Sequence, residues 1–247
     1  MVVIKTEDDL KRMRVSNRLA ARVRDEVAGW IRPGLTTQEI GAYAAELIRK
    51  AGGECAFLGY QGFPGTICVS VNEEVVHGIP GGRRVEIGDL VSLDIGVLID
   101  GFYGDTATTV MVGVTDPEWI RLVRVTEQAL RAGVEQAVCG NRVSDISHAV
   151  QRTVEKAGFT VVRDFVGHGI GRELHEDPQV PNYGKPGKGG LLRPGMTLAI
   201  EPMVNMGKAA VKVMEDGWTV RTRDRMPSAH FEHTVAISSA GPEILTV

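Results

Sequence analysis

Two carboxylates interrupt an otherwise apolar hairpin pattern at residues 93–110, LDIGVLIDGFYGDTATTV. Asp94 stands in the first run and Asp105 in the second, and the dipeptide Asp100-Gly101 between them favours a tight β-hairpin turn. Residues opposed across that turn have numbers that sum to 201, whereas Asp94 and Asp105 give 199. The offset of two keeps both side chains on one face. Because a carboxylate in a buried strand is costly, the two acids of this hairpin are expected to be neutralised, paired or metal-bound.

A second pair of acids, Glu201 and Glu232, has a comparable arrangement further along the chain. Asp216-Gly217 is another hairpin dipeptide, and residues opposed across a turn there have numbers that sum to 433, as Glu201 and Glu232 do. On the second strand His230 shares the face of Glu232, whereas His233 points to the opposite face. Two carboxylates this close do not both stay ionised without a cation.

Two histidines lie in the stretch FVGHGIGRELHEDP, residues 165–178. His168 stands among glycines, where the backbone can approach a ligand closely, and His175 follows seven residues later. Their spacing fits neither a His-x-x-x-His helix nor a Cys/His structural zinc site. Two aspartates, two glutamates and one histidine form an oxygen-rich set that suits Mn, Fe(II), Co or Zn. Two such ions about 3.5–4 Å apart with a bridging water form a hydrolytic centre, which is the chemistry that these residues predict.

Helical and strand-like patterns alternate along the chain, which predicts an α+β fold. Helix starts are signalled by Thr6, by the capping boxes Thr36/Glu39 and Thr115/Glu118, and by Ser144. The four helices are expected to end at Pro33-Gly34, Gly52-Gly53, about Cys139 and Gly158. Strand-like runs lie at residues 66–71, 90–99, 102–113, 197–206, 209–215, 218–222 and 231–238.

The order helix, helix, strand, acid, turn, acid occurs twice in the sequence. A shift of 106 residues places Lys50-Ala51-Gly52 on Lys156-Ala157-Gly158, and a shift of 107 places Asp94 on Glu201. We therefore expect two related halves in a single domain, with the four acids meeting at their junction. The expected boundaries are 34–113 and 140–240 for the halves, and 1–247 for the domain.

Composition excludes several classes of function. The net charge of −3 comes with interspersed signs and no basic stripe for specific nucleic-acid binding. No apolar run approaches the roughly 20 residues that span a bilayer. The start, MVVIKTEDDLKRM, lacks the apolar region of a signal peptide. Cys55, Cys68 and Cys139 have no CxxC spacing and are expected to be reduced thiols, so we expect a cytoplasmic globular protein.

Five sequence motifs together resemble those of the type I methionine aminopeptidases. They are HGIP at His77–Pro80, LDIG with GDTA, GHGIG with LHEDPQVPNY, AIEPM at Ala199–Met203, and SAHFEHT at Ser228–Thr234. The resemblance covers nearly the whole chain in order. It implies the pita-bread fold, a pseudo-two-fold repeat of helix pairs packed on a curved, mostly antiparallel sheet. It also implies removal of the initiator methionine from nascent proteins when the second residue is small, with a transient ribosome contact as a further expectation.

The resemblance assigns the metal ligands residue by residue. Asp94 and Asp105 are expected to bridge or chelate one divalent ion, and His168 to bind the other. Glu201 and Glu232 would complete the pair, and Glu201 also corresponds to the general base for the bridging water. The free α-amine of the substrate would bind one metal, which explains why such enzymes cleave only at the N-terminus.

The resemblance also assigns substrate contacts. His175 corresponds to the donor to the scissile carbonyl oxygen, an oxyanion role, and His77 to a contact with the peptide just beyond the cleaved bond. The implied methionine pocket is formed by Tyr60, Phe63, Cys68 and Trp218. Two positions depart from the family pattern. Phe57 stands where the family has a small or sulfur-bearing residue, and Leu174 stands where an aromatic residue is frequent.

Two other functions fit the same motifs. One is another pita-bread peptidase, of the prolidase or proline aminopeptidase kind, which usually carries an additional N-terminal domain. The other is a non-catalytic pita-bread protein that acts as a binding module at the ribosome or on RNA; such relatives tend to lose metal ligands, and here every ligand type is present. The short distance from Glu201 to Glu232 argues against the type II enzymes.

Overall fold

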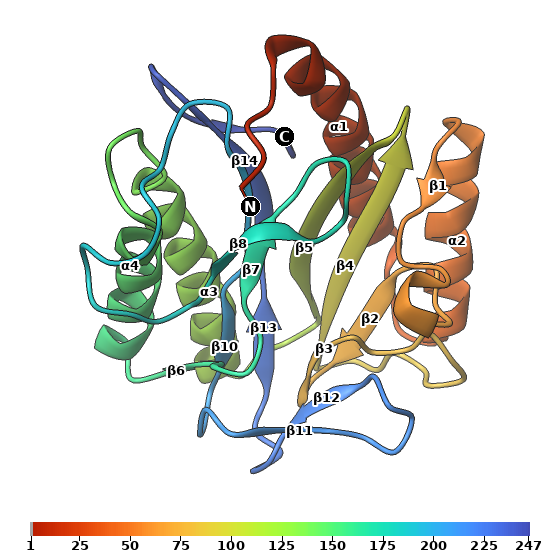
Figure 1. The fold of residues 1–247 in the computed structure, drawn as a ribbon. Coiled ribbons are helices and arrows are strands. Elements are labelled where there is room, and N and C mark those ends of the chain that lie inside the picture. Colours follow the sequence, from red (N-terminus) through yellow and green to blue (C-terminus); the bar gives the residue numbers. More distant parts are fainter. Residues whose placement is uncertain (1) are drawn as a thin grey trace.

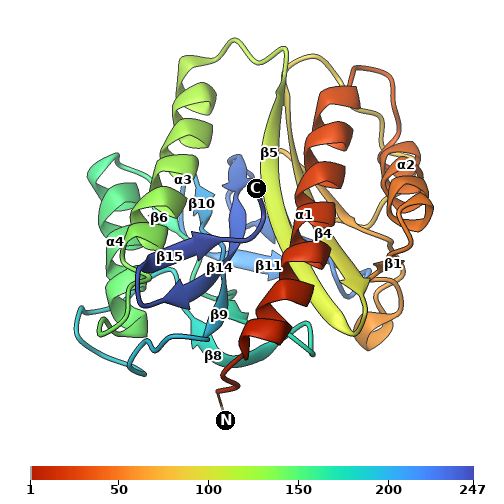
Figure 2. The same ribbon diagram turned by 90° about the horizontal axis from the view of Figure 1, so that it is seen from above.

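Helix pairs flank a curved sheet in the computed structural model, which describes residues 2–247 (Figure 1). Met1, the first residue of the predicted domain 1–247, lies outside the described residues. The described residues form the helices α1 (Glu7–Trp30), α2 (Thr37–Lys50), α3 (Pro117–Glu135) and α4 (Val143–Lys156). Seen from above, α1 lies against the strands of the first half and α3 against those of the second (Figure 2). The predicted α+β class is confirmed.

Most strands belong to one nine-stranded sheet with the order β1-β4-β5-β14-β9-β7-β8, in which β2 pairs with β4 and β15 with β14. Its strands are β1 (Glu54–Cys55), β2 (Cys68–Val71), β4 (Asp89–Ile99), β5 (Phe102–Val112), β7 (Gly167–Gly169), β8 (Glu176–Val180), β9 (Thr197–Ile200), β14 (Glu232–Ser238) and β15 (Gly241–Ile244). Two three-stranded sheets contain β6 (Thr160–Val161), β10 (Met203–Asn205) and β13 (Ser228–His230), and β3 (Glu74–Val76), β11 (Val211–Val213) and β12 (Val220–Thr222). All the strand pairings that residues 2–247 make are antiparallel.

The hairpin register predicted around Asp100-Gly101 is confirmed. β4 and β5 pair with residue numbers that sum to 201, so Asp94 lies opposite Ala107 and Gly96 opposite Asp105. Both turn residues have positive φ, +49° at Asp100 and +75° at Gly101, the backbone of a turn whose twist matches the flanking strands. Asp94 and Asp105 are therefore diagonal neighbours on one face of the hairpin.

The register predicted for the second half, in which the numbers of paired residues sum to 433, is also observed. It extends over more residues than one plain hairpin. Ile200 of β9 pairs with His233 of β14, Met203 of β10 pairs with His230 of β13, and Val213 of β11 pairs with Val220 of β12. One register thus runs through three pairs of strands, although these strands belong to three sheets. It brings Glu201 next to the first residue of β14, Glu232.

The predicted starts of two helices are wrong by one or two residues. Asp116, not Thr115, caps α3: its carboxylate accepts the backbone N–H groups of Glu118 and Trp119, and Pro117 occupies the first helical position, where its missing N–H costs nothing. The predicted end near Cys139 is also late, because α3 ends at Glu135.

The cap of the fourth helix is corrected in the same way. α4 starts at Val143, and the Asp145 carboxylate accepts the backbone N–H of Arg142. Ser144 lies inside the helix, and its hydroxyl donates to the carbonyl oxygen of Lys188. The serine is used to fix a distant loop, a contact that local sequence does not reveal. The capping boxes at Thr6 and Thr36 are present, and the second of these was predicted with its partner Glu39.

Helix α1 lies in direct backbone contact with β5 beside the acid pair. A Cβ added at Gly104 would lie 2.7 Å from the backbone nitrogen of Asn17. Asn17 is buried and donates to the carbonyl oxygens of Met13 and Tyr103. The glycine next to Asp105 therefore allows the helix to cover this strand. None of the helices within residues 2–247 combines the length and the apolar character that crossing a bilayer requires.

We expect Gly104→Ala to destabilise the protein by about 1–3 kcal/mol, the usual cost of overpacking a filled interior. Gly29→Ala is the matched control, since a Cβ there meets nothing within 4 Å and the position lies within α1. It is expected to stabilise the protein by about 0.5–1 kcal/mol. Thermal unfolding measures both, at roughly 2–4 °C per kcal/mol for a chain of this size. Equal melting temperatures for the two variants would contradict the backbone contact.

Candidate metal centre and its pocket

One cavity of about 160 Å³ collects every site residue predicted from the sequence. It is lined by the predicted ligands Asp94, Asp105, His168, Glu201 and Glu232, and by His77, His175, Tyr60, Phe63, Cys68 and Trp218. Phe57 and Leu174, the two departures from the family pattern, line it as well. Gln61 also lines it and was not predicted, because it lies in an irregular segment with no pattern to mark it.

Adjacent strands bring the acids together. Asp94 and Asp105 come from β4 and β5, and β14, the next strand, begins at Glu232, which pairs with Ala107. Two hydroxyls fasten β14 to β5: Thr106 donates to the Glu232 carbonyl oxygen and Thr234 to the Asp105 carbonyl oxygen, both at 2.9 Å or less. The backbone positions of the acids are therefore fixed by the sheet itself.

The imidazole of His168 completes a compact set of donor atoms. Asp105, His168 and Glu232 each offer one such atom, and the three atoms lie within 4.8 Å of one another, all buried. The Nε2 atom of His168 lies 3.5 Å from Oε1 of Glu201 and 4.0 Å from Oδ2 of Asp105. His168 itself is carried by β7, which pairs with β9.

The donor atoms fit a divalent cation. Asp94 Oδ1, Asp105 Oδ1 and Glu232 Oε1 are buried and receive no hydrogen bond from any of the residues 2–247. Buried carboxylate oxygens without a donor are rare in folded proteins, and a cation at this place would satisfy them. His168 Nδ1 lies 2.8 Å from the carbonyl oxygen of Gly169. Since that oxygen only accepts, Nδ1 carries the proton, and the lone pair of Nε2 faces the carboxylates, as in metal-binding histidines.

The electrostatics of the cluster also favour a bound cation. Burial raises the pKa of Asp94 to about 7. Burial, followed by the charges of Glu232 and Asp94, raises the pKa of Asp105 well above its ordinary value. Burial, followed by the charges of neighbouring carboxylates, also raises the pKa values of Glu201 and Glu232. These carboxyl groups cannot all be charged near neutral pH without a cation.

His230 is a polar neighbour of the cluster. The sequence predicted that it shares the face of Glu232 but assigned it no role. Its Nε2 atom lies 3.8 Å from Oε2 of Glu201, is buried, and has no hydrogen-bond partner among the described residues. Burial lowers the pKa of His230 to about 3, so the ring is neutral. As predicted from the strand alternation, His233 lies on the other face, where Nδ1 is 2.8 Å from the Thr246 hydroxyl.

His175 lies at the border between the acid cluster and the apolar part of the cavity. Its ring stands edge-on to that of His168, with centroids 4.3 Å apart, and its Nδ1 lies 2.7 Å from the hydroxyl of Tyr60. Burial lowers the pKa of His175. A neutral His175 whose Nδ1 accepts from Tyr60 carries its proton on Nε2 and can donate it.

Aromatic rings and one thiol form the rest of the cavity wall. Phe63 and Trp218 meet edge-on with centroids 5.1 Å apart, and His77 meets Trp218 at 6.1 Å. Cys68 pairs with Asp94 across β2 and β4, and burial raises the pKa of its thiol, so it is uncharged. Phe57 covers Gly96, where an added Cβ would lie 2.4 Å from the phenyl ring. This end of the cavity therefore suits an uncharged side chain.

Comparison with known proteins agrees with this geometry. The chain matches the profile of metallopeptidase family M24 over residues 11–239. It is 50% identical to methionine aminopeptidase 1 of Bacillus subtilis over 246 residues, covering 100% of this chain and 99% of that protein. The crystal structure of methionine aminopeptidase from Thermotoga maritima superposes with a TM-score of 0.98 at 49% identity, covering 100% and 99% of the two chains. The prolidase from Pyrococcus furiosus shares the pita-bread fold, with a TM-score of 0.80 at 22% identity, and this chain covers 65% of it.

Proposed function

Since the chain belongs to metallopeptidase family M24 and to its methionine aminopeptidases, we propose that it removes the N-terminal methionine from nascent proteins whose second residue is small. The observation that carries this proposal is that one cavity has buried carboxylate oxygens without a hydrogen-bond donor at one side and an apolar wall at the other. The first part suits hydrolytic metal chemistry, and the second suits an unbranched thioether side chain.

We propose that Asp94, Asp105, His168, Glu201 and Glu232 hold two divalent ions, of Co, Mn, Fe(II) or Zn. Such ions, when bound, lower the pKa of a coordinated water and stabilise negative charge on the tetrahedral intermediate. Four carboxylates and a neutral imidazole supply the charge and the donor types for a pair of these ions. The unpartnered oxygens of Asp94, Asp105 and Glu232 support this assignment.

Glu201 is the residue that we assign to proton transfer. In the metal-free protein, burial and the charges of Asp94 and Asp105 raise the pKa of its carboxyl group, so that it takes up a proton more readily than an exposed glutamate. Its two oxygens face His168 and His230, both of which are neutral. Neither ring therefore places a positive charge beside a proton that Glu201 accepts.

The histidines are assigned to the substrate backbone. His175, with its proton on Nε2, would donate a hydrogen bond to the scissile carbonyl oxygen as negative charge develops there. His77 would contact the peptide just beyond the cleaved bond, where its ring lies against Trp218 and Phe165. Burial lowers the pKa of His77 to about 4, so this contact is made by a neutral ring.

The methionine side chain would occupy the wall formed by Phe63, Cys68 and Trp218, with Tyr60 at the border to His175. Phe57 and Leu174 belong to the same buried apolar cluster and close this end of the cavity. Newly made proteins are the substrate of such an enzyme, so we expect it in the cytoplasm, in transient contact with the ribosome.

The experiment that tests the function starts from metal-free protein. Activity is expected to return when Mn, Fe(II), Co or Zn is added, with Met-Ala-Ser trimmed to Ala-Ser and methionine, as followed by mass spectrometry. Met-Leu-Ser and peptides that begin Xaa-Pro serve as controls and should largely survive. Efficient Xaa-Pro cleavage would assign the chain to the prolidase kind, and inactivity with every metal would favour the non-catalytic binding module.

A further inference from the structure

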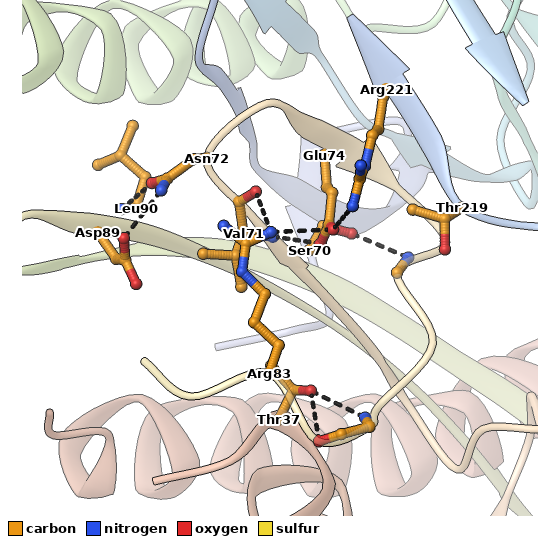
Figure 3. A network of polar contacts seen from close by, with 12 residues as sticks. Thr37, Ser70, Val71, Asn72, Glu74, Arg83, Asp89, Leu90, Thr219 and Arg221 are labelled. Atoms are coloured by element: carbon orange, nitrogen blue, oxygen red, sulfur yellow. Dashed lines mark hydrogen bonds and ion pairs between the residues drawn. The ribbon is translucent and has the colours of Figure 1, made fainter. Parts of the chain in front are cut away.

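A buried carboxylate outside the cavity connects three segments of the chain (Figure 3). Glu74, the first residue of β3, is only 7% exposed and lines no part of the site. Its Oε1 atom accepts hydrogen bonds from Nη1 of Arg83 at 3.0 Å and from Nη2 of Arg221 at 2.9 Å, and its Oε2 atom accepts the backbone N–H of Val71 at 2.9 Å. One side chain therefore joins the end of β2, the segment after His77, and β12.

The segment that follows His77 is held at two more points in the same view. The Ser70 hydroxyl accepts the backbone N–H of Gly78 at 3.0 Å, and the backbone of Gly81 exchanges two hydrogen bonds with the hydroxyl of Thr37 in α2 (Figure 3). A Cβ at Gly78 would lie 2.3 Å from the carbonyl oxygen of Val69, so the backbone is in close contact here. The chain on both sides of His77 is thus anchored.

His77 needs such an anchor. Its φ is +59°, in the left-handed region that costs free energy for a residue with a side chain and persists only when the surroundings impose it. His77 directly follows β3, whereas Trp218 lies two residues before β12. Figure 1 shows β12 next to β3, although the two strands are far apart in the sequence. The two strands that meet at Glu74 therefore carry two neighbouring walls of the cavity.

The pairing of these strands is not fixed by hydrophobic alternation alone. Val76 pairs with Val220, but Glu74 pairs with Arg221, so the register shifts by one residue between the two pairs. At such a bulge the backbone ladder is interrupted, and a specific side-chain contact must select the register. The Glu74–Arg221 ion pair stands at this irregular position and is charge-assisted, which makes it strong and directional.

We infer that Glu74 is a positioning residue for the reaction: its carboxylate fixes β3 against β12 and thereby sets the distance between His77 and Trp218. Its kinetic consequence rests on the proposed function, and its structural consequence does not. Arg83 makes the second such contact, since its Nη1 atom donates to the same oxygen and so holds the segment that follows His77. This role requires the negative charge and both carboxylate oxygens of Glu74, because three donors bind to these two oxygens.

The test is Glu74→Gln, with Glu243→Gln as the matched control. Glu243 also makes two charge-assisted hydrogen bonds to an arginine, Arg14, at 2.7 and 2.8 Å, and it lies outside the cavity. With Met-Ala-Ser as substrate, Glu74→Gln is expected to raise KM roughly tenfold, the effect of about 1.4 kcal/mol of lost binding, while kcat changes less. Glu243→Gln should leave both constants unchanged.

A second readout needs no activity. In metal-free protein carrying Trp30→Phe and Trp119→Phe, Trp218 is the single tryptophan, and acrylamide quenching reports its exposure. Glu74→Gln is expected to increase quenching, and Glu243→Gln is not. If Glu74→Gln fails to fold, Arg221→Lys keeps the positive charge without the planar fork and should show the same two effects in weaker form.

The outcomes separate this inference from the proposed function. Unchanged KM and unchanged Trp218 quenching in the Glu74 variant, or in Arg221→Lys where that variant replaces it, would overturn the positioning role. Equal loss in Glu74→Gln and Glu243→Gln would overturn it too, since any broken ion pair would then suffice. A parent protein that never cleaves Met-Ala-Ser refutes the proposed function, and the quenching arm alone then decides the role of Glu74.

Discussion

Glu201→Gln is expected to lower kcat for Met-Ala-Ser by roughly 10²–10⁴-fold, the usual contribution of a positioned general base. The substitution keeps the shape of the side chain but removes its ability to accept a proton. Both oxygens of Glu201 face the centre of the site, 3.5 Å from Nε2 of His168 and 3.8 Å from Nε2 of His230. Because proton transfer acts in the transition state, kcat should fall more than KM rises.

The same variant must be shown to be folded and to bind metal. Circular dichroism of the metal-free variant should be unchanged, since burial and like charges disfavour the ionised form of Glu201 there and an amide relieves both. Metal content, measured after dialysis, separates loss of the base from loss of a ligand. A kcat within roughly tenfold of the parent, in a folded and metal-loaded variant, would contradict the assigned role, because that loss is below the usual range for a general base.

Much of the fold was predictable because its signals are local. The Asp100-Gly101 turn fixes the register of β4 and β5, and strand alternation then places Asp94 and Asp105 on one face. The sum of 433 extended this logic to Glu201 and Glu232, and the observed pairing of β9 with β14 follows it. The convergence of the acids was thus predictable from periodicity, whereas their individual roles came from resemblance to a family.

What could not be predicted depends on contacts between distant residues. β7 and β13 have three residues each, too few for a period to be recognised, and both are fixed by partners elsewhere in the chain. Ser144 matches a helix-cap signal, but its hydroxyl binds a loop 44 residues away. The bond between Glu74 and Arg221 spans 147 residues, and no local pattern distinguishes that glutamate from Glu73, its half-buried neighbour.

Glu232→Gln is expected to have opposite effects on stability and on activity. In the metal-free protein, burial and then the charges of Glu201 and Asp94 raise the pKa of Glu232 well above its ordinary value. A group whose pKa is raised by folding contributes stability that is present below its unfolded pKa, about 4.3, and is lost as the pH rises through the folded value. The metal-free parent should therefore lose stability as the pH rises from about 4.

The glutamine variant does not pay this penalty. Metal-free Glu232→Gln should melt higher than the metal-free parent at pH 8, with the difference shrinking as the pH falls to 5. The lowered pKa values of His168 and His230 act in the opposite sense, with stability lost as the pH falls from about 6.5 to about 3, but they are common to both proteins and cancel in the difference. Each kcal/mol should appear as roughly 2–4 °C in the melting temperature.

Addition of Mn or Co should reverse the order of the two proteins. A cation that binds only the folded state stabilises it, and its binding releases protons from the carboxyl groups, so the gain in the parent should grow with pH. Glu232→Gln offers one charge fewer and should gain less, while hydrolysis of Met-Ala-Ser falls sharply. Calorimetry of the parent and the variant, each with and without metal, at pH 6 and at pH 8, checks these expectations. If the metal-free variant is no more stable than the parent at pH 8, repulsion among these carboxylates is not what a bound cation relieves.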